Sequence, residues 1–177
     1  MAQEKKIEII SANSLDKDEL LFPDANILKG SPNKQVHLSH DEMDIFSNNA
    51  IFFQRKNKFI ATGDVFLKQG DSLELKCDSL NYDGKIKKFF SYGKVYLINN
   101  KTTLNSNELL YDRKKNIASF FNGGNIIDSL TTIQSKKGDY LLEIDKYKFR
   151  NDITITNPDY VIAVSYTHLR AHETRYD

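Results

Sequence analysis

Apolar and polar residues alternate over short stretches along almost the whole chain between Ile7 and Ile162. In the stretches 73–77, 94–98 and 152–156, every second residue is apolar or β-branched, which is the period of a strand with one buried face. Turn-forming residues interrupt the pattern roughly every 8–12 residues, and we expect Asp83-Gly84 to form a tight hairpin with positive φ. The pattern predicts an all-β chain of antiparallel strands, with no helix in its repeated part.

A sequence motif recurs three times. It consists of a predicted strand that begins with glycine, a second predicted strand, and a tyrosine that follows an apolar residue by two positions. It begins at Gly63, Gly93 and Gly124 and reaches Tyr82, Tyr111 and Tyr140, which are spaced 29 residues apart. Aligning the tyrosines brings Leu75, Leu104 and Ile133 to one shared position. A repeat of this length is typical of stacked supersecondary units that share a continuous core.

An earlier and longer unit can be aligned with an offset of 37 residues. This alignment places Leu38 on Leu75, and Met43 and Ile45 on Leu80 and Tyr82. This unit runs from Gly30 to Phe46 and contains Pro32, which cannot donate a hydrogen bond in a sheet, so we expect the first section to be irregular.

Strand alternation assigns one side of each repeat to the interior. Glu74 and Lys76 face solvent on this assignment, and Cys77 faces inward as a small buried residue. No amphipathic helix is present to cover the apolar side, so the sheet must fold on itself or bind something apolar. The side chains expected to line this apolar trough are Val65, Leu67, Leu73, Leu75, Leu80, Tyr82, Val95, Leu97, Leu104, Leu109, Tyr111, Ile133 and Tyr140.

Charge and residue types give little support to catalysis or to polyanion binding. The formal net charge of the 177 residues is +1, so no overall positive field attracts nucleic acid. His37 and His40 are three apart on a predicted strand and point to opposite faces, which disfavours a metal site. We expect the basic clusters 85–88 and 113–115 to be solvated lysines and arginine that shield sheet edges. The sequence predicts a protein that is not an enzyme and has no cofactor and no metal.

The two ends of the chain differ in character from the middle. The first six residues lack the apolar stretch of a secretion signal, so a signal for export is expected to have been removed. Residues 164–177 break the strand rhythm and resemble a translated sequencing adapter, so we expect one domain at 1–163 and a non-native tail at 164–177. The native array is expected to continue beyond this point, because the last half-unit is cut at Tyr160.

The repeats resemble the OstA-like N-terminal family of lipopolysaccharide transport. The segments that carry the resemblance are Gly63-Asp-Val-Phe-Leu with Asp78-Ser-Leu-Asn-Tyr-Asp83, Gly93-Lys-Val-Tyr-Leu with Asn107-Glu-Leu-Leu-Tyr-Asp112, and the opening Ile7–Leu15. The resemblance covers about 7–163 and implies a curved antiparallel β-jellyroll that is open along one side, with acyl chains carried inside.

The resemblance also implies partners and a location. It implies a periplasmic protein that carries lipopolysaccharide or a similar acylated lipid, joins other OstA-like modules end to end by strand-edge pairing, and meets an outer-membrane translocon. Two alternatives stay open. One is a structural or adhesive repeat whose interior is filled by its own side chains, and the other is a carbohydrate-binding β-solenoid, which the absence of Trp disfavours.

Overall fold

The computed structural model describes residues 5–164 and the backbone of 168–170. Strands dominate this part of the chain, and two short 3₁₀ helices, η1 (Gln54–Lys56) and η2 (Leu142–Ile144), occur at turns. The strands are β1 (Glu8–Ser11), β2 (Ser14–Asp16), β3 (Asn26–Lys29), β4 (Val36–His40), β5 (Met43–Ser47), β6 (Asn49–Phe53), β7 (Lys58–Gln69), β8 (Leu73–Asp83), β9 (Lys88–Asn99), β10 (Thr102–Asp112), β11 (Ile117–Phe120), β12 (Gly124–Asp128), β13 (Thr131–Ser135), β14 (Lys137–Leu141), β15 (Lys146–Arg150), β16 (Ile153–Asn157), β17 (Tyr160–Val164) and β18 (His168–Arg170).

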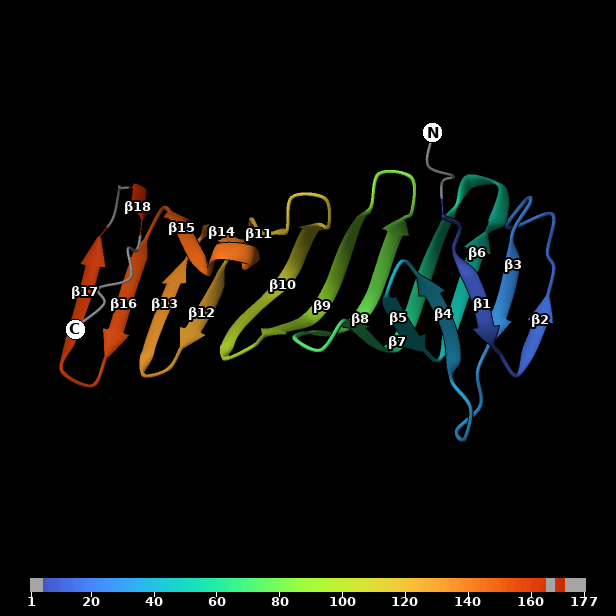
Figure 1. Cartoon of the computed structure of the whole chain (residues 1–177), viewed down its shortest axis with the longest axis horizontal. Helices are drawn as coiled ribbons and strands as arrows, with labels where there is room; N and C mark the ends of the chain where they lie inside the picture. Colours follow the sequence, from blue (N-terminus) through green and yellow to red (C-terminus); the bar gives the residue numbers. More distant parts are fainter. Residues whose placement is uncertain (1–4, 165–167, 171–177) are drawn as a thin grey trace.

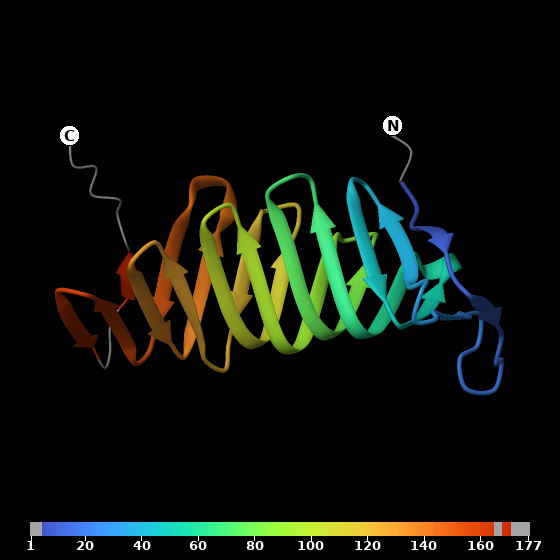
Figure 2. The ribbon, with the colours of Figure 1, turned by 90° about the horizontal axis from the view of Figure 1, so that it is seen from below.

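These strands pair in two antiparallel rows that run side by side along the molecule (Figures 1 and 2). We call one row the leucine arm; in order of pairing it contains β1, β4, β5, the second half of β7, the first half of β8, the second half of β9, the first half of β10, β12, β13, β16 and β17. The other row, the tyrosine arm, contains β2, β3, β6, the remaining halves of β7–β10, β11, β14, β15 and β18.

The long strands β7–β10 join the arms because each bends in its middle and continues from one arm into the other. The pairing register shifts at each bend, between Thr62 and Val65, between Lys76 and Ser79, and between Ser106 and Glu108. Gly63 and Gly93 lie at bends with φ of 76° and 72°, a conformation that side chains disfavour. This requirement explains the glycine that leads the first two repeats.

The third repeat makes the same turn with a different residue. Gly124 pairs with Ser106, as Val95 does, so Gly124 stands in the register of Val95 rather than that of Gly93. The positive φ of 95° falls on Gly123, in the break between β11 and β12.

The alignment of the first unit with an offset of 37 is wrong. Ile45 lies in the same row as Leu75, since both pair with Leu67, and Phe52 and Tyr82 both pair with Phe59. The true offset is therefore 30 residues, and β5 with β6 is the counterpart of β8. Phe52 takes the place of the tyrosine, so a search for the tyrosine missed this unit.

The expectation of a tight hairpin at Asp83-Gly84 is also wrong. Asp83 pairs with Lys88, which leaves a loop of four residues, and the positive φ of 57° falls on Lys87. The Asp83 carboxylate accepts hydrogen bonds from the backbone N–H groups of Lys85 and Ile86. These bonds stabilise the four-residue loop in place of a two-residue hairpin turn. Asp112 does the same in the next loop, which explains the aspartate that follows the repeated tyrosine.

The core lies between the two arms along their whole length. The terminal strands β1, β2, β17 and β18 do not pair with one another among the described residues, so the sheet stays open instead of closing as a barrel. The prediction of an all-β fold, an open and curved antiparallel β-jellyroll, is confirmed. Of the predicted tail 164–177, Val164 ends β17 and 168–170 form β18, while the rest lies outside the described residues.

Candidate functional site

The inner face of the leucine arm carries one uninterrupted row of Leu and Ile, with one residue from each strand. Each member stands opposite the next in the pairing register, at the spacing of adjacent strands, about 4.8 Å. The row, which we call the leucine row, is Ile9, Leu38, Ile45, Leu67, Leu75, Leu97, Leu104, Ile126, Ile133, Ile155 and Ile162.

The inner face of the tyrosine arm carries a corresponding aromatic row. Its rings pack in tilted pairs, with centroids 5.4 Å apart for Phe59 and Tyr82, and 5.0 Å apart for Phe89 and Tyr111. The row, which we call the tyrosine row, is Phe52, Phe59, Tyr82, Phe89, Tyr111, Ala118, Tyr140 and Tyr147.

All thirteen residues predicted to line the trough point into the interior and are only 0–6% exposed. Leu67, Leu75, Leu97, Leu104 and Ile133 belong to the leucine row, and Tyr82, Tyr111 and Tyr140 belong to the tyrosine row. Val65, Leu73, Val95, Leu80 and Leu109 flank these rows within the same core. The prediction that these side chains face inward is confirmed; that they hold lipid stays a prediction.

The side opposite the bends is the mouth of the jellyroll. Among the described residues, Asn57 of the tyrosine arm accepts a hydrogen bond there from the backbone N–H of Ile7 at 2.9 Å, and two larger groups of polar side chains also span the mouth. We call the first the N-terminal clasp; it consists of His40, Asp41 and Gln69 of the leucine arm with Tyr82, Lys87 and Arg113 of the tyrosine arm. Arg113 donates to the Tyr82 hydroxyl at 2.8 Å, to the Gln69 side chain at 2.8 Å and to the Asp41 carbonyl at 2.7 Å. Lys87 forms an ion pair with the Asp41 carboxylate.

Tyr82 and His40 form the buried centre of this clasp. The His40 Nε2 lies 3.0 Å from the Lys5 carbonyl oxygen, so this nitrogen carries the hydrogen, and Nδ1 then accepts from the Tyr82 hydroxyl at 2.7 Å. Burial lowers the pKa of His40, and Arg113 lowers it further. The neutral imidazole is therefore the form that fits this network.

The second place, the C-terminal clasp, uses neutral groups and carboxylates. Asn99 of the leucine arm donates to the Tyr140 hydroxyl at 2.8 Å, and Thr102 lies 3.1 Å from the Tyr147 hydroxyl. Tyr140 in turn donates to Asp145 at 2.7 Å, and Tyr147 donates to Asp128 at 3.3 Å. Burial raises the pKa of both tyrosines, so both hydroxyls stay protonated and can donate.

Beyond the clasps, the interior reaches the surface at the N-terminal end of the molecule. A cavity of about 450 Å³ lies there between the arms, lined by Ile7 and Ile9 on one side and by Phe52 on the other, with a polar rim of Lys6, Glu8 and Gln54. Ile9 and Phe52 are the first members of the two inner rows. At the other end, Ile162 closes the leucine row and is 47% exposed.

Sequence reasoning missed the clasps because their partners are far apart along the chain. Tyr82 and His40 are separated by 42 residues, and Arg113 and Gln69 by 44. The basic clusters were expected to be solvated, but Lys87 and Arg113 link the arms, and Lys88 pairs with Asp112 at 3.1 Å. The available signal was the presence of basic residues in the loops after Tyr82-Asp83 and Tyr111-Asp112.

The two histidines and Cys77 lie on the faces that strand alternation predicted. His37 lies on the outer face against Phe46 and Asp44, whereas His40 points inward, so the two imidazoles do not converge. Burial raises the pKa of the Cys77 thiol to about 12, which makes it unreactive. In the described part of the chain, no group of three His, Cys, Asp or Glu side chains is placed to hold a metal ion. The two 3₁₀ helices described there are too short to cross a bilayer.

Comparison with known proteins shows which fold and family this architecture matches. No curated protein matches the chain. The crystal structure of LptH from Pseudomonas aeruginosa, the LptA homologous periplasmic component of the conserved lipopolysaccharide transport device, has the same fold with a TM-score of 0.58. The two chains are 14% identical, and the alignment covers 74% of this chain and 94% of LptH. The model of the OstA-like protein family matches residues 4–165, nearly the whole chain. The protein therefore belongs to the OstA-like family, as its repeats indicated.

Proposed function

We propose that this protein is a non-enzymatic lipid-binding relay module that carries the acyl chains of lipopolysaccharide between its two arms. The observation that carries the proposal is the continuity of the apolar interior. The leucine row extends without a polar interruption from Ile9 to Ile162, and the interior reaches the surface in a cavity at its N-terminal end. A path of this kind suits a long apolar chain better than a compact ligand.

The energetics suit transfer rather than storage. Each CH₂ removed from water contributes about 0.8 kcal/mol, so a chain of a dozen carbons gains roughly 10 kcal/mol before ordering and association costs. The leucine row offers nearly the same apolar contacts at every strand. An acyl chain can therefore move along the row without leaving a site that binds it more tightly than the others. The direction of movement is then set by other parts of the assembly.

The mouth is where a branched lipid has to enter, because its head group cannot pass through the core. The thirteen lining residues are already packed against one another, so the arms must part to admit an acyl chain. The clasps hold the arms by side-chain hydrogen bonds and ion pairs alone. They are therefore the contacts that open, while the bends on the opposite side keep the arms joined.

The proposed setting follows from the family and from the similarity to LptH. The module acts in the periplasm, pairs end to end with other OstA-like modules through the edges of its terminal strands, and passes lipid toward an outer-membrane translocon. β17 is suited to such pairing because it pairs only with β16 among the described strands, and Val161 on it is 68% exposed.

A structural array is the second candidate, and the packed interior is the observation that favours it. To separate the two, photo-crosslinking side chains are placed at the inward positions Leu75, Tyr82 and Leu104 and at the outward positions Glu74 and Lys76. With purified lipopolysaccharide we expect labelling of the inward set only, while circular dichroism verifies folding. Equal labelling of both sets, or of neither, would refute the lipid path.

A second experiment tests entry through the mouth. Gln69→Cys and Arg113→Cys, in a Cys77→Ser background, are joined by a short bismaleimide to tie the arms together. A matched control joins Lys87→Cys and Arg113→Cys, which lie on the same arm and share a backbone hydrogen bond of 3.0 Å. Joining the arms should abolish labelling at Leu75, and joining within one arm should preserve it. Unchanged labelling in both would show that lipid does not enter here.

A further inference from the structure

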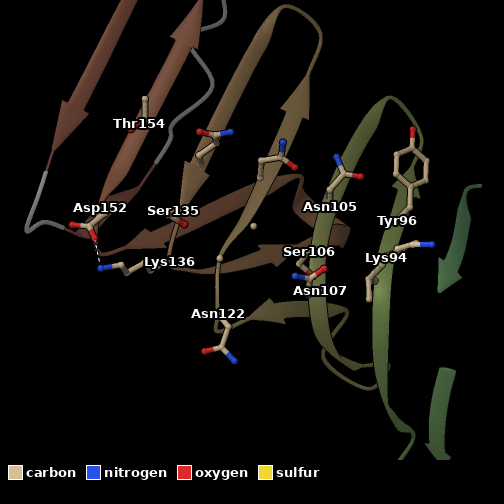
Figure 3. A pocket seen from close by; sticks show the side chains of 15 residues that line it. Lys94, Tyr96, Asn105, Ser106, Asn107, Asn122, Ser135, Lys136, Asp152 and Thr154 are labelled. Atoms are coloured by element: carbon tan, nitrogen blue, oxygen red, sulfur yellow. Dashed lines mark ion pairs between the residues drawn. The ribbon is translucent and has the colours of Figure 1, made fainter. Parts of the chain in front are cut away.

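A polar groove lies on the outer face of the leucine arm, on the far side of the sheet from the apolar interior. It has a volume of about 750 Å³ and lies across β9, β10, β12, β13 and β16, next to the bends (Figure 3). Its walls are formed by Tyr96 and Lys94 at one side and by Thr154 and the Lys136–Asp152 ion pair at the other (Figure 3).

Three amide side chains form the floor of this groove. Asn105 pairs with Asn125 across β10 and β12, and Asn125 pairs with Gln134 across β12 and β13. Their chain neighbours Leu104, Ile126 and Ile133 belong to the leucine row, so alternation turns all three amides outward. The result is a row of amides at the spacing of adjacent strands, continued by Tyr96 on β9 and by Thr154 on β16.

The amides make no hydrogen bond with the protein, or with one another, within the described part of the chain. The Oδ1 atom of Asn125 is buried and lacks any partner. A buried polar atom without a partner costs about 1–3 kcal/mol, and a rotation of the Asn125 side chain, which lines the groove, would bring this atom within reach of a ligand that satisfies it. The side chains of Asn122 and Ser106, by contrast, already bind Glu108 and are not available in the same way.

The chemistry of the row selects the class of ligand. Each amide offers both a donor and an acceptor, which matches a hydroxyl group that also does both. Tyr96 is 40% exposed at the end of the row, and an exposed aromatic ring can stack on the apolar face of a sugar ring. The charges in the groove are few, since Lys136 and Asp152 lie 2.5 Å apart and neutralise each other.

We infer that this groove binds a saccharide, through hydrogen bonds from Asn105, Asn125 and Gln134 and through stacking on Tyr96. The site lies outside the lipid path and does not depend on it. An acyl chain in the interior and a glycan in the groove would occupy opposite faces of the same arm. The proposed carbohydrate site lies on the outer face of the sheet. It does not use the repeated tyrosines, which face inward.

The test uses two lipid-free probes: the core oligosaccharide released from lipopolysaccharide, and dextran as an unrelated neutral glycan. Each is titrated into the ¹⁵N-labelled protein, and the side-chain amide signals of Asn105, Asn125 and Gln134 are followed by NMR. We expect these signals to shift saturably with at least one probe. Signals that stay in place at millimolar glycan, or that move with protein concentration alone because a second copy covers the groove, would overturn the inference.

Variants locate the binding. Asn105→Ala, Gln134→Ala and Tyr96→Ala should each weaken the glycan affinity about tenfold, the loss expected for one contact of this kind. Asn81→Ala is the matched control, because Asn81 faces outward on the tyrosine arm between Ile60 and Phe90. Thermal unfolding verifies that all four variants fold. Equal affinity in the groove variants and the control would contradict the site, and photo-crosslinking of the interior remains a separate measurement.

Discussion

The tyrosines that mark the repeat contribute two separate parts to the fold. The ring of Tyr82 packs in the tyrosine row, while its hydroxyl joins His40 and Arg113 across the mouth. Alternation with inward leucines was enough to predict the buried ring. The hydroxyl contacts were beyond prediction, because they depend on how far the two arms lean toward each other, and no local pattern of residues reports that distance.

Tyr82→Phe removes the hydroxyl and keeps the ring. We expect a loss of about 1–3 kcal/mol in the free energy of unfolding, because His40 and Arg113 each lose a buried partner. Tyr111→Phe is the comparison, since among the described residues the Tyr111 hydroxyl donates to Asn116, on its own arm. Urea unfolding measures both. An equal loss for the two variants would show that bonding across the mouth adds no stability.

Acidification should weaken the N-terminal clasp through His40. The folded pKa lies below the ordinary value of 6.5, so the unfolded chain binds a proton that the folded chain does not. The contribution of neutral His40 to the free energy of unfolding is therefore fully present above the pKa of the unfolded chain and falls as the pH drops below it. Protonation at Nδ1 also removes the acceptor for Tyr82, beside the charges of Arg113, Lys87 and Asp41.

The unfolding free energy at about pH 7.5 and about pH 5.5 tests this expectation. The native protein should lose stability between these values, and His40→Gln should show a smaller dependence on pH. A dependence that is the same in both proteins would assign the effect to other groups.

The bends set a strict demand on single residues. Gly93→Ala should cost about 1 kcal/mol for the positive φ and about 1–3 kcal/mol more, because its Cβ would collide with the Asp78 carboxylate. Gly70→Ala tests the first term alone, since Gly70 has φ of 58° and open space around it. Adding Asp78→Ala to Gly93→Ala removes the carboxylate and should recover most of the extra loss of stability in urea unfolding, while the Cβ of residue 78 stays 2.9 Å from the new methyl group. A double variant as unstable as Gly93→Ala would exclude the collision with the carboxylate as the cause.

At the scale of the element, the sequence predicts single strands better than it predicts which strands correspond between units. Period-two alternation predicted the strands and their inward faces, because one buried face imposes that pattern directly. The first unit was misaligned because Phe52 fills the tyrosine position equally well. In the third unit, Gly138 stands where Leu80 and Leu109 stand in the others, and the Phe120 ring fills the space, 2.5 Å from where a Cβ would lie. Such exchanges preserve packing but erase the sequence signal.

The leucine row should be most sensitive at its centre. Leu104→Ala leaves a cavity in a fully buried site and should cost about 2–5 kcal/mol. Ile162→Ala, at the exposed end of the same row, should cost about 0.5 kcal/mol or less. Urea unfolding compares the two. Similar costs would mean that the row does not form one continuous core.

At the scale of the whole molecule, the two sides of the jellyroll are held by different forces. Four strands cross between the arms at the bends, so that side is covalent, while the mouth is held by the clasps. The sequence predicted an open side from the family resemblance, but gave no sign of the contacts that span it. The cavity at the N-terminal end was equally hidden, because it depends on where Phe52 and Ile9 meet.

End-to-end association belongs to this scale as well. Val161→Lys places a charge on the exposed strand β17 and should shift any oligomer toward the monomer in sedimentation velocity, as charged edge strands do. Lys137→Ala, away from the edge, serves as the control. Association that survives Val161→Lys unchanged would place the interface elsewhere.

Because the repeat length is nearly constant, the number of repeats sets the length of the molecule. Each unit of 29 or 30 residues adds two strands to each arm, which lengthens the molecule by about 10 Å at the usual strand spacing. The added strands enter between existing ones and leave the terminal edges unchanged. A gene that gains or loses one such unit would therefore change how far the protein reaches, while both of its ends keep the same surfaces for docking.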